Sequence, residues 1–365
     1  MNVESAIKKL MEDEHPDEET LAELLSIEDP SDCERLHKAA YAVKERGVGP
    51  VAYFRGLVEF SNVCTNNCHY CGIRRDRQIN RYTMTKGEIL ECAAVALKNR
   101  YGSLVLQSGE RDDPEFIDFV NDAVREIKRQ DNGKIGITLS CGEQTEETYR
   151  RWFEAGAHRY LLRIESSDST LYAKLHPADQ NFERRVECLR SLRRTGYQVG
   201  TGVMIGLPFQ TAEHLARDIL FFKGMDIDMI GMGPYVLHDD TPLAAEVVNT
   251  PEEKARRLFL ALRMIALTRI AMPDVNIAAA TALQALDPKG REKAILAGAN
   301  VVMPNLTPTK YRGDYLLYEN KPCVDEDSDM CLSCLERRIQ SIGETVGWDQ
   351  WGDSKHFFKR TSNKS

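Results

Sequence analysis

The feature that most restricts the fold is a regular alternation of short apolar runs and longer amphipathic segments, beginning at residue 51. Strands that alternate with helices over roughly 250 residues predict a parallel sheet. Eight such units predict a closed (β/α)8 barrel of the TIM type, with its active site at the C-terminal ends of the strands. We expect strands at 53–61, 103–107, 135–140, 159–165, 198–205, 229–235, 275–280 and 300–303, and helices that include 85–98, 113–129, 145–155, 182–195 and 251–269.

The expected barrel, residues 51–305, is flanked by two segments of different character. Residues 1–50 are acidic and place apolar side chains at helical spacing, which predicts a small helical cap. Residues 306–365 lose the alternation and contain three cysteines, and we expect a C-terminal extension packed against the barrel. The predicted fold class is therefore α/β, a barrel with an N-terminal cap and a C-terminal extension.

Composition excludes several classes of protein. With 42% hydrophobic and 28% charged residues and a net charge of −8, the chain should bury a core, and neither nucleic acid nor an anionic membrane is favoured as its partner. The long apolar stretch 258–272 contains Arg263 and Arg269, which indicates a buried helix and not a membrane span. The acidic N-terminus does not resemble a signal peptide. We expect a cytoplasmic protein whose ten cysteines are thiols or metal ligands.

Cys64, Cys68 and Cys71 follow the first expected strand at C-x3-C-x2-C spacing. Three thiolates on one loop can hold three corners of a 4Fe–4S cubane and leave the fourth iron without a protein ligand. S-adenosylmethionine (SAM) can chelate that iron, and an electron from the cluster can then break a carbon–sulfur bond. A structural zinc site is the alternative, but zinc prefers a fourth Cys or His, and His69 lies too close in sequence to complete it.

This triplet and the segments after it resemble the radical SAM superfamily. Tyr70, immediately before Cys71, matches the aromatic residue that lies along the adenine of SAM in that superfamily. Ser108-Gly109-Glu110, after the second expected strand, resembles the motif that meets the SAM amino group. A glycine there allows close backbone approach, and a carboxylate pairs with an ammonium. By itself, the tripeptide is also compatible with a surface turn.

Further candidate SAM contacts follow the later strands. Arg163 and Glu165 alternate with Ile164 and therefore share one strand face, where they suit a carboxylate and ribose hydroxyls, respectively. A salt bridge inside the barrel is the alternative interpretation. Arg185 is a second candidate for the SAM carboxylate, and Ile205 offers backbone and apolar contact to adenine.

Long segments resemble, more narrowly, the FeFe-hydrogenase maturase HydE family. They are EFSNVCTNNCHYCGIRRD, LVLQSGE, RYLLRIES, MIGLPFQT, GPYVLHDDTPLA and GREKAILAGANVVMPNLTPTKYR. The resemblance implies an enzyme that generates a 5′-deoxyadenosyl radical during assembly of the two-iron subsite of the hydrogenase H-cluster. It implies an iron–cysteine substrate bearing carbon monoxide and cyanide. It also implies the maturases HydG and HydF as partners, with a reductant such as ferredoxin or flavodoxin.

The resemblance also implies a substrate cavity inside the barrel. An anionic substrate needs cationic and hydroxyl donors in a cavity closed to water. A hydrogen-bonded layer of inward polar residues, as in any barrel, is the alternative. The positions carried over from the family are Arg55, Gln107, Thr138, Thr281, Met303 and Tyr315.

Two departures from the family pattern leave other functions open. Ser166-Ser167 stands where Thr-Ala is frequent, and Ala280 precedes Thr281 where a second threonine is frequent. A HydE-like enzyme acting on an amino acid, of the methylornithine synthase or biotin synthase type, is the alternative. A pure iron–sulfur scaffold is a third hypothesis, although it would need no SAM pocket. Biotin synthase needs a second cluster within its barrel, and we interpret Cys92, Cys141 and Cys188 instead as separate core residues.

Cys323, Cys331 and Cys334 form a second group at C-x7-C-x2-C spacing. Some members of the HydE family carry such a triplet, which implies an auxiliary iron–sulfur cluster outside the barrel that activity does not require. Three reduced thiols in a surface tail are the alternative.

Overall fold

The computed structural model describes residues 2–13, 15–325 and 328–362, with the side chains of 328–333 left aside. Within these residues, eight parallel strands form a ring in the order β10-β1-β2-β3-β4-β5-β7-β9. A bridge between Ala278 and Val301 joins the last strand to the first and closes the barrel, which confirms the predicted fold class. The strands of the ring are β1 (Val51–Ser61), β2 (Ser103–Ser108), β3 (Gly136–Ser140), β4 (Arg159–Leu161), β5 (Gln198–Thr201), β7 (Met229–Ile230), β9 (Asn276–Ile277) and β10 (Val301–Val302).

Two of the expected strands are interrupted. The expected strand 198–205 divides into β5 and β6 (Met204–Ile205), and 229–235 divides into β7 and β8 (Gly233–Pro234). The break falls where Gly202 lies against the backbone of Gly231, so closely that a Cβ atom would not fit. Two adjacent strands thus bend together, and β6 and β8 form their own pair beyond the ring.

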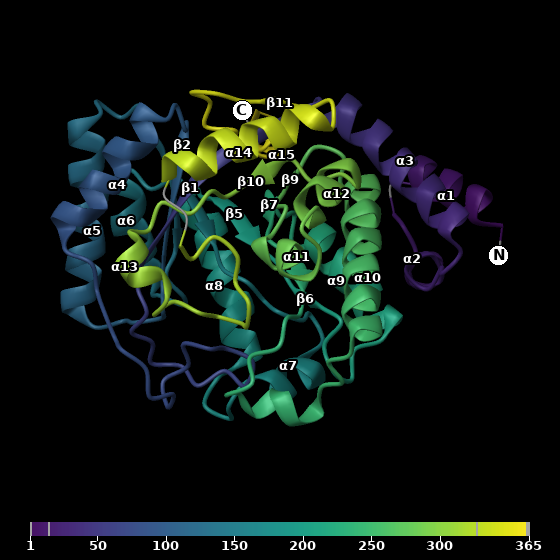
Figure 1. Cartoon of the computed structure of the whole chain (residues 1–365), viewed down its shortest axis with the longest axis horizontal. Helices are drawn as coiled ribbons and strands as arrows, with labels where there is room; N and C mark the ends of the chain where they lie inside the picture. The colour runs from purple at the N-terminus through teal and green to yellow at the C-terminus, as the bar shows by residue number, and fades with distance from the viewer. Residues whose placement is uncertain (1, 14, 326–327, 363–365) are drawn as a thin grey trace.

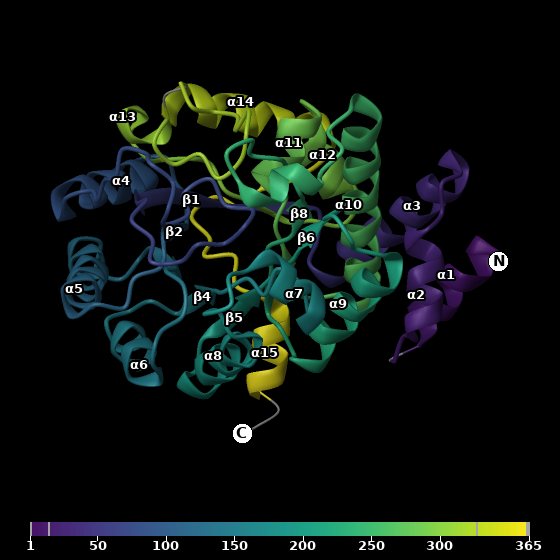
Figure 2. The same cartoon turned by 90° about the horizontal axis from the view of Figure 1, so that it is seen from below.

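Helices surround the strands on all sides (Figure 2). Their N-termini are set by capping side chains: Thr85, Asp113, Thr145, Asn181 and Thr250 each accept a hydrogen bond from the first helical turn. The short helices α7, α11 and α12 are not among the expected ranges named above, and their one or two turns carry little hydrophobic periodicity. The surrounding helices are α4 (Lys86–Lys98), α5 (Pro114–Gln130), α6 (Glu146–Glu154), α7 (Ser169–Leu175), α8 (Phe182–Thr195), α9 (Ala212–Gly224), α10 (Pro251–Ala271), α11 (Thr281–Leu286) and α12 (Gly290–Leu296).

The N-terminal segment forms three helices on the outside of the barrel, at the right of Figure 1. They are α1 (Val3–Glu12), α2 (Glu18–Leu25) and α3 (Pro30–Gly47). Helix α2 packs on α9 and α10, and α3 packs on α10. Leu21, Leu24 and Leu25 are fully buried there, so the apolar face of α2 holds this segment on the barrel.

The C-terminal segment is more regular than expected and closes the N-terminal end of the barrel. Strand β11 (Thr345–Val346) pairs in parallel with the start of β1. The backbone then runs under the ring, where the carbonyl of Gly352 accepts hydrogen bonds from Arg55 (2.8 Å) and Asn276 (2.8 Å). Figure 1 shows β11 and α14 at the end of the molecule opposite α7. The remaining elements are η1 (Pro242–Glu246), α13 (Thr309–Arg312), α14 (Ser328–Ser341) and α15 (Lys355–Ser362).

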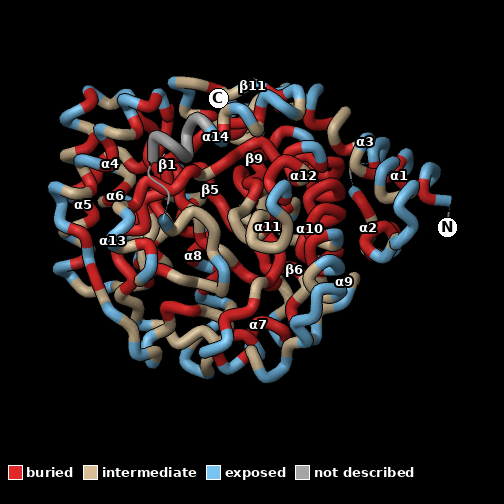
Figure 3. The backbone as a smooth tube through the Cα atoms, in the orientation of Figure 1, coloured by how far each residue is buried: buried red, intermediate tan, exposed pale blue. Residues whose placement is uncertain are grey.

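Buried residues follow the strands and the inward faces of the helices (Figure 3). None of the helices in the described part of the chain is long and apolar enough to span a bilayer. In α10, Arg263 and Arg269 are buried and donate to the carbonyls of Leu25 and Gly298, respectively.

A buried ion pair joins the two ends of the chain. The ammonium of Lys44 in α3 lies 2.7 Å from the carboxylate of Glu344, and both side chains are fully buried. Tyr41 also donates to that carboxylate, at 2.7 Å. Burial lowers the pKa of Lys44 to about 8, and the charge of Glu344 opposes this fall. The pair therefore ties the N-terminal helices to the segment that closes the barrel.

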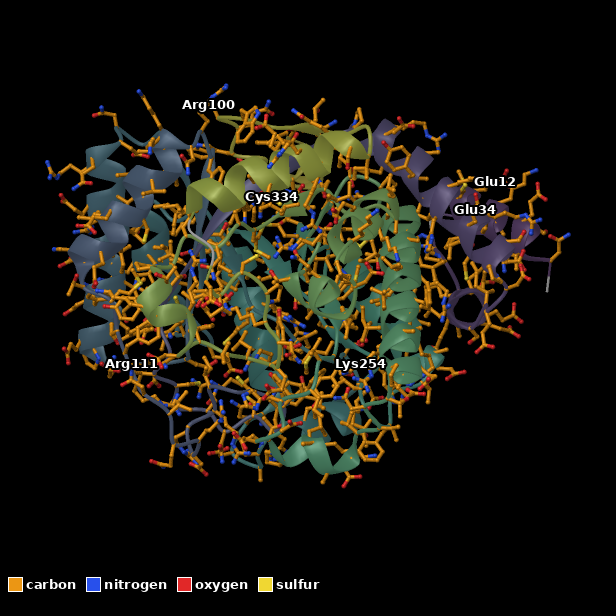
Figure 4. The ribbon with its side chains drawn as sticks, in the orientation of Figure 1. Glu12, Glu34, Arg100, Arg111, Lys254 and Cys334 are labelled. Atoms are coloured by element: carbon orange, nitrogen blue, oxygen red, sulfur yellow. The ribbon has the colours of Figure 1, made fainter. Side chains whose placement is uncertain are left out.

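Replacing Glu344 by Ala should destabilise the protein by about 3–5 kcal/mol, because it leaves a buried ammonium without its carboxylate. Urea unfolding followed by circular dichroism measures the change. Glu34 is the matched control: it pairs with Lys38 at 2.6 Å but is 65% exposed, and Figure 4 shows it on the outer helices. Glu34→Ala should leave the unfolding midpoint unchanged. Equal stability of the two variants would contradict the role assigned to the buried pair.

Candidate active site

The three cysteines of the first triplet line one cavity at the C-terminal ends of the strands. The cavity has a volume of about 300 Å³ and is bounded by residues that follow β1, β2, β3, β4 and β8, a volume within the range of ligand pockets. Figure 4 shows the orientation: Arg100, which precedes β2, and Arg111, which follows it, lie at opposite ends of the molecule. The cavity lies at the end of the barrel where Arg111 is found, and the neighbouring Glu110 lines it.

The loop that carries the cysteines has no regular secondary structure and is held by backbone contacts with its surroundings. Thr65 donates to the carbonyl of Glu110 (2.9 Å), and His69 donates to the carbonyl of Leu175 (2.9 Å). Gly72 donates to Leu317 in the C-terminal segment (3.0 Å). The loop is thus fixed between the segments that follow β2, β4 and β10.

The thiols lie in surroundings that disfavour three negative charges. Burial raises the pKa of Cys64, Cys68 and Cys71, that of Cys71 to about 12, and the neighbouring thiolates raise the pKa of Cys68 and Cys71 further. Within the described residues, no three His, Cys, Asp or Glu side chains converge on a single point, as one metal ion would require. A cubane places each thiolate on a separate iron and supplies compensating positive charge. The donor set therefore fits three corners of such a cluster.

The part of the cavity wall that follows β4 carries an ion pair, Arg163 and Glu165. Arg163 lies 2.8 Å from Glu165, but its Nε and Nη2 and the Oε2 of Glu165 are buried without a hydrogen bond of good geometry. Glu165 has φ +63°, a strained value for a residue with a side chain. Burial raises the pKa of Glu165, and Arg163 opposes this rise. These groups suit a ligand that supplies both acceptors and donors.

Arg185 belongs to an ion-pair network beside this wall. It lies 2.6 Å from Glu143 and 3.7 Å from Glu110. Burial disfavours its charge, but the two carboxylates outweigh that effect and hold the pKa of Arg185 above its ordinary value. The sequence reasoning missed Glu143. A signal was present: Cys141-Gly142-Glu143 after β3 repeats the Ser-Gly-Glu pattern found after β2.

The aromatic residue of the triplet also lines the cavity. The hydroxyl of Tyr70 lies 3.3 Å from Nε2 of His176, whose Nδ1 lies 2.9 Å from the carbonyl of Tyr172. Burial lowers the pKa of His176 to about 3, so the ring is neutral, Nδ1 donates and Nε2 accepts from Tyr70. Ser108 lines the cavity too, whereas Ile205 is buried beside it and its carbonyl accepts from Tyr235 (2.7 Å).

Two of the predicted substrate residues lie deeper in the barrel. Arg55 and Thr138 line a small cavity of about 30 Å³, whose wall shares Met303 with the larger one. Arg55 is fully enclosed and donates to the sulfur of Met229 (3.1 Å) and to Gly352. Within the described part of the chain, it has no ion-pair partner. Thr138 accepts a hydrogen bond from Arg159 (2.9 Å).

The other predicted substrate residues divide into two groups. Gln107 and Tyr315 line the larger cavity, where Gln107 donates to the Tyr315 hydroxyl (3.2 Å). Thr281 begins α11, and its hydroxyl accepts from Arg291 (3.1 Å). Its neighbours Ala280 and Ala282 line the cavity instead. The roles of all these residues remain predictions.

The other described cysteines are not among the residues that line the cavity. Cys92, Cys141 and Cys188 are buried and contact the carbonyls of Leu306, Leu106 and Gln144, respectively. This arrangement agrees with their interpretation as separate core residues. In the second triplet, the side chain of Cys331 falls outside the described residues, while Cys334 is exposed on α14 (Figure 4). An auxiliary cluster at Cys323, Cys331 and Cys334 thus stays a prediction.

Comparison with known proteins agrees with this site. The model of the radical SAM superfamily matches residues 58–222. The chain is 46% identical over 343 residues to the [FeFe] hydrogenase maturase subunit HydE of Thermotoga maritima, covering 93% of this chain and 94% of the relative. It is 28% identical over 330 residues to 3-methylornithine synthase of Methanosarcina barkeri, covering 88% of each.

Solved structures share the same barrel. Methylornithine synthase aligns with a TM-score of 0.79 and 25% identity, over 94% of this chain and 98% of that one. The [FeFe]-hydrogenase maturase HydG aligns with a TM-score of 0.81, over 99% of this chain and 80% of that one; at 20% identity it shares the fold.

The closed barrel, the cysteine loop after β1 and the matching superfamily model define a radical SAM enzyme. Within that class, the chain belongs to the HydE family of [FeFe]-hydrogenase maturases. Membership implies a 4Fe–4S cluster and SAM as the cofactors.

Replacing Cys68 by Ala should abolish both cluster assembly and SAM cleavage, because only two iron corners would keep a thiolate. Iron analysis and chromatographic detection of 5′-deoxyadenosine after anaerobic reconstitution measure the two losses. Cys188→Ala, which removes a buried thiol that does not line the cavity, should retain both properties. SAM cleavage by the Cys68→Ala protein would contradict the assignment of the site.

Proposed function

We propose that Cys64, Cys68 and Cys71 hold the 4Fe–4S cluster and that SAM occupies the cavity of about 300 Å³ beside them. The three thiols, Tyr70, Glu110, Arg163 and Glu165 all line this one cavity. When bound, the cluster supplies the electron that splits SAM into methionine and a 5′-deoxyadenosyl radical. Arg163 and Glu165 are paired with each other at 2.8 Å, but the Nε of Arg163 is buried without a hydrogen bond, which supports a bound ligand with a complementary acceptor.

Different residues around the cavity bind different groups of SAM. Glu110 accepts from the ammonium, and Arg163, with unused N–H groups, donates to the carboxylate. Arg185 contacts both Glu110 and Glu143 and keeps these carboxylates in position. Glu165 accepts from the ribose hydroxyls.

The adenine end of SAM lies against apolar and aromatic groups. Tyr70 provides the aromatic face, and its orientation is fixed by the hydrogen bond to His176. Ile205 and its neighbour Met204 cover the base from the side of β6, with Met204 in the cavity wall. Ser108 and Gly109 form the close backbone approach after β2, where a Cβ on Gly109 would clash with Val63.

We further propose the HydE-type substrate, an iron–cysteine unit that carries carbon monoxide and cyanide. The larger cavity can hold its body, while the small cavity between Arg55 and Thr138 has room for one small ligand arm. Arg55 has a buried charge without an acidic partner among the described residues, which suits an anionic group. Gln107, Met303 and Tyr315 form the wall between cluster and substrate.

HydG and HydF are the proposed partner maturases, with ferredoxin or flavodoxin as reductant. The observation that carries this function is the 46% identity to the Thermotoga HydE over 93% of the chain. The candidate auxiliary cluster at the second cysteine triplet has no part in this chemistry.

A second function, rearrangement of a free amino acid, is favoured by the similarity in sequence and fold to methylornithine synthase. An amino acid also carries the carboxylate that Arg55 could bind. The two functions differ in the compound that stimulates SAM cleavage, which is an iron–cysteine unit in one and a free amino acid in the other. They also differ in outcome, which is hydrogenase maturation or a rearranged amino acid.

Arg55→Ala should leave cluster content and SAM binding intact but reduce maturation of apo-hydrogenase by roughly 10- to 100-fold. The reason is the loss of a charge-assisted contact worth about 1.5–3 kcal/mol, which also orients the substrate. The assay is in vitro maturation with HydG and HydF present. Arg55→Lys, which retains the charge, is the control and should recover part of the activity.

The same assay decides between the two functions. A wild-type protein that fails to support maturation, and whose 5′-deoxyadenosine formation is strongly stimulated by a free amino acid, would replace the maturase proposal with the mutase.

A further inference from the structure

The cysteine loop is closed on itself by one side chain, that of Arg81. Its Nη1 donates to the carbonyls of Asn62 (2.7 Å) and Ile73 (2.8 Å). Its Nη2 donates to the carbonyls of Arg74 (2.6 Å), Arg75 (3.2 Å) and Arg77 (3.0 Å). The acceptors stand on both sides of the triplet, so the guanidinium joins the two ends of the segment that contains Cys64, Cys68 and Cys71.

The backbone around Arg81 is fixed to the same point. Asn62 donates through its amide to the carbonyl of Asn80 (2.7 Å), and its side-chain oxygen accepts from the backbone of Tyr82 (2.8 Å). Asn62 is fully buried. Because residues 80 and 82 are held in this way, the position of Arg81 is set by the end of β1 and not by solvent.

Arg81 keeps its charge without an acidic partner. Among the described residues, no carboxylate lies within ion-pair distance of it, whereas Arg75 and Arg77 pair with Asp76 (2.9 Å) and Asp240 (2.9 Å), respectively. Carbonyl dipoles stabilise the half-buried guanidinium in place of a carboxylate. The carbonyl dipoles do not cancel the net positive charge of the guanidinium at longer range. The electric field of Arg81 therefore reaches neighbouring groups.

The field of Arg81 acts on the cysteines. The Nη1 atom of Arg81 lies within hydrogen-bond distance of the carbonyls of Asn62 and Ile73, which stand two residues from Cys64 and Cys71, respectively. The positive charge is therefore held beside the part of the loop that carries these two thiols. A cluster held at the same sulfurs becomes more negative by one charge when it is reduced, and a fixed positive charge beside it stabilises the reduced state.

We propose that Arg81 is a positioning residue of the cluster site, which closes the cysteine loop through backbone carbonyls and raises the reduction potential of the cluster. This inference rests on the proposed function, because it takes Cys64, Cys68 and Cys71 as the ligands. It assigns to Arg81 two separable effects: its donor geometry holds the loop, and its charge sets the potential.

Three variants separate the two effects. Arg81→Gln removes the charge and most of the donors, and Arg81→Lys keeps the charge but loses the planar fork that reaches several carbonyls. Arg75→Gln is the matched control, since it removes an arginine of the same loop that is 51% exposed, is already paired with Asp76, and makes one contact with a loop carbonyl, that of Thr65 (3.3 Å), against the five of Arg81. Each protein is reconstituted anaerobically, its iron is counted, and the cluster is titrated with reductant without SAM while the EPR signal of the reduced state is followed.

The Arg81→Gln cluster should have a more negative potential than the wild type, while Arg81→Lys and Arg75→Gln should stay at the wild-type value. Iron retained after gel filtration should fall in both Arg81 variants and not in Arg75→Gln. Equal potentials in Arg81→Gln and the wild type would overturn the proposal, as would an equal shift in Arg75→Gln.

If Arg81→Gln binds no cluster at all, the Arg81→Lys variant tests the proposal instead. A cluster retained there at the wild-type potential upholds the proposal, because the charge alone then rescues the site. Loss of the cluster from both variants, with circular dichroism unchanged, would overturn the role of the charge. A wild-type protein that binds no cluster would instead contradict the proposed function.

Discussion

Closure of the strands into a parallel ring is the constraint on which the site depends. In such a ring all strands run the same way, so the segments after β1, β2, β3 and β4 meet at one end. Residues nearly a hundred positions apart, such as Cys64 and Arg163, therefore line one cavity. The opposite end must be sealed for that cavity to exclude water, and the C-terminal segment seals it with the carbonyl of Gly352 and the side chain of Asp353. The geometry of the site thus depends on the closed barrel.

Buried charged side chains are stabilised in two different ways in this structure. Lys44 is paired with Glu344 and Arg185 with Glu143, and these pairs hold segments together. Arg55 and Arg81 differ, because within the described residues they are stabilised by carbonyls or sulfur and not by carboxylates. A positive charge that is stabilised only by carbonyls or sulfur can still pair with an anionic ligand. Arg263 and Arg269 in α10 are also bonded to carbonyls, so Arg55 and Arg81 are distinguished by their place, beside the small cavity and beside the cysteine loop, respectively.

The sequence predicted most of the barrel because each long strand carries a run of Val, Ile or Leu and each long helix a capping residue. The cysteine triplet was predicted because its chemistry depends on local spacing, and Glu110 was predicted from the resemblance of Ser108-Gly109-Glu110 to a superfamily motif. Contacts across long separations were not, since Arg55 and Gly352 are 297 positions apart and neither carries a sign of the other. Arg81 was missed for a different reason: its partners are backbone carbonyls, which every residue has. Thr281 was expected in the substrate cavity, but α11 starts at that residue and its hydroxyl contacts Arg291.

We propose that the three thiolates would leave one iron of the cluster free to bind SAM, and Glu110 and Arg163 line the same cavity. The most direct measurement is electron–nuclear double resonance on the reduced cluster with SAM labelled with ¹⁵N at the amino group or ¹⁷O at the carboxylate. The account predicts hyperfine coupling from both labels to the cluster, which would disappear when unlabelled SAM is used. A reduced 4Fe–4S signal without coupling from either label would show that SAM does not reach the open iron and would contradict the account.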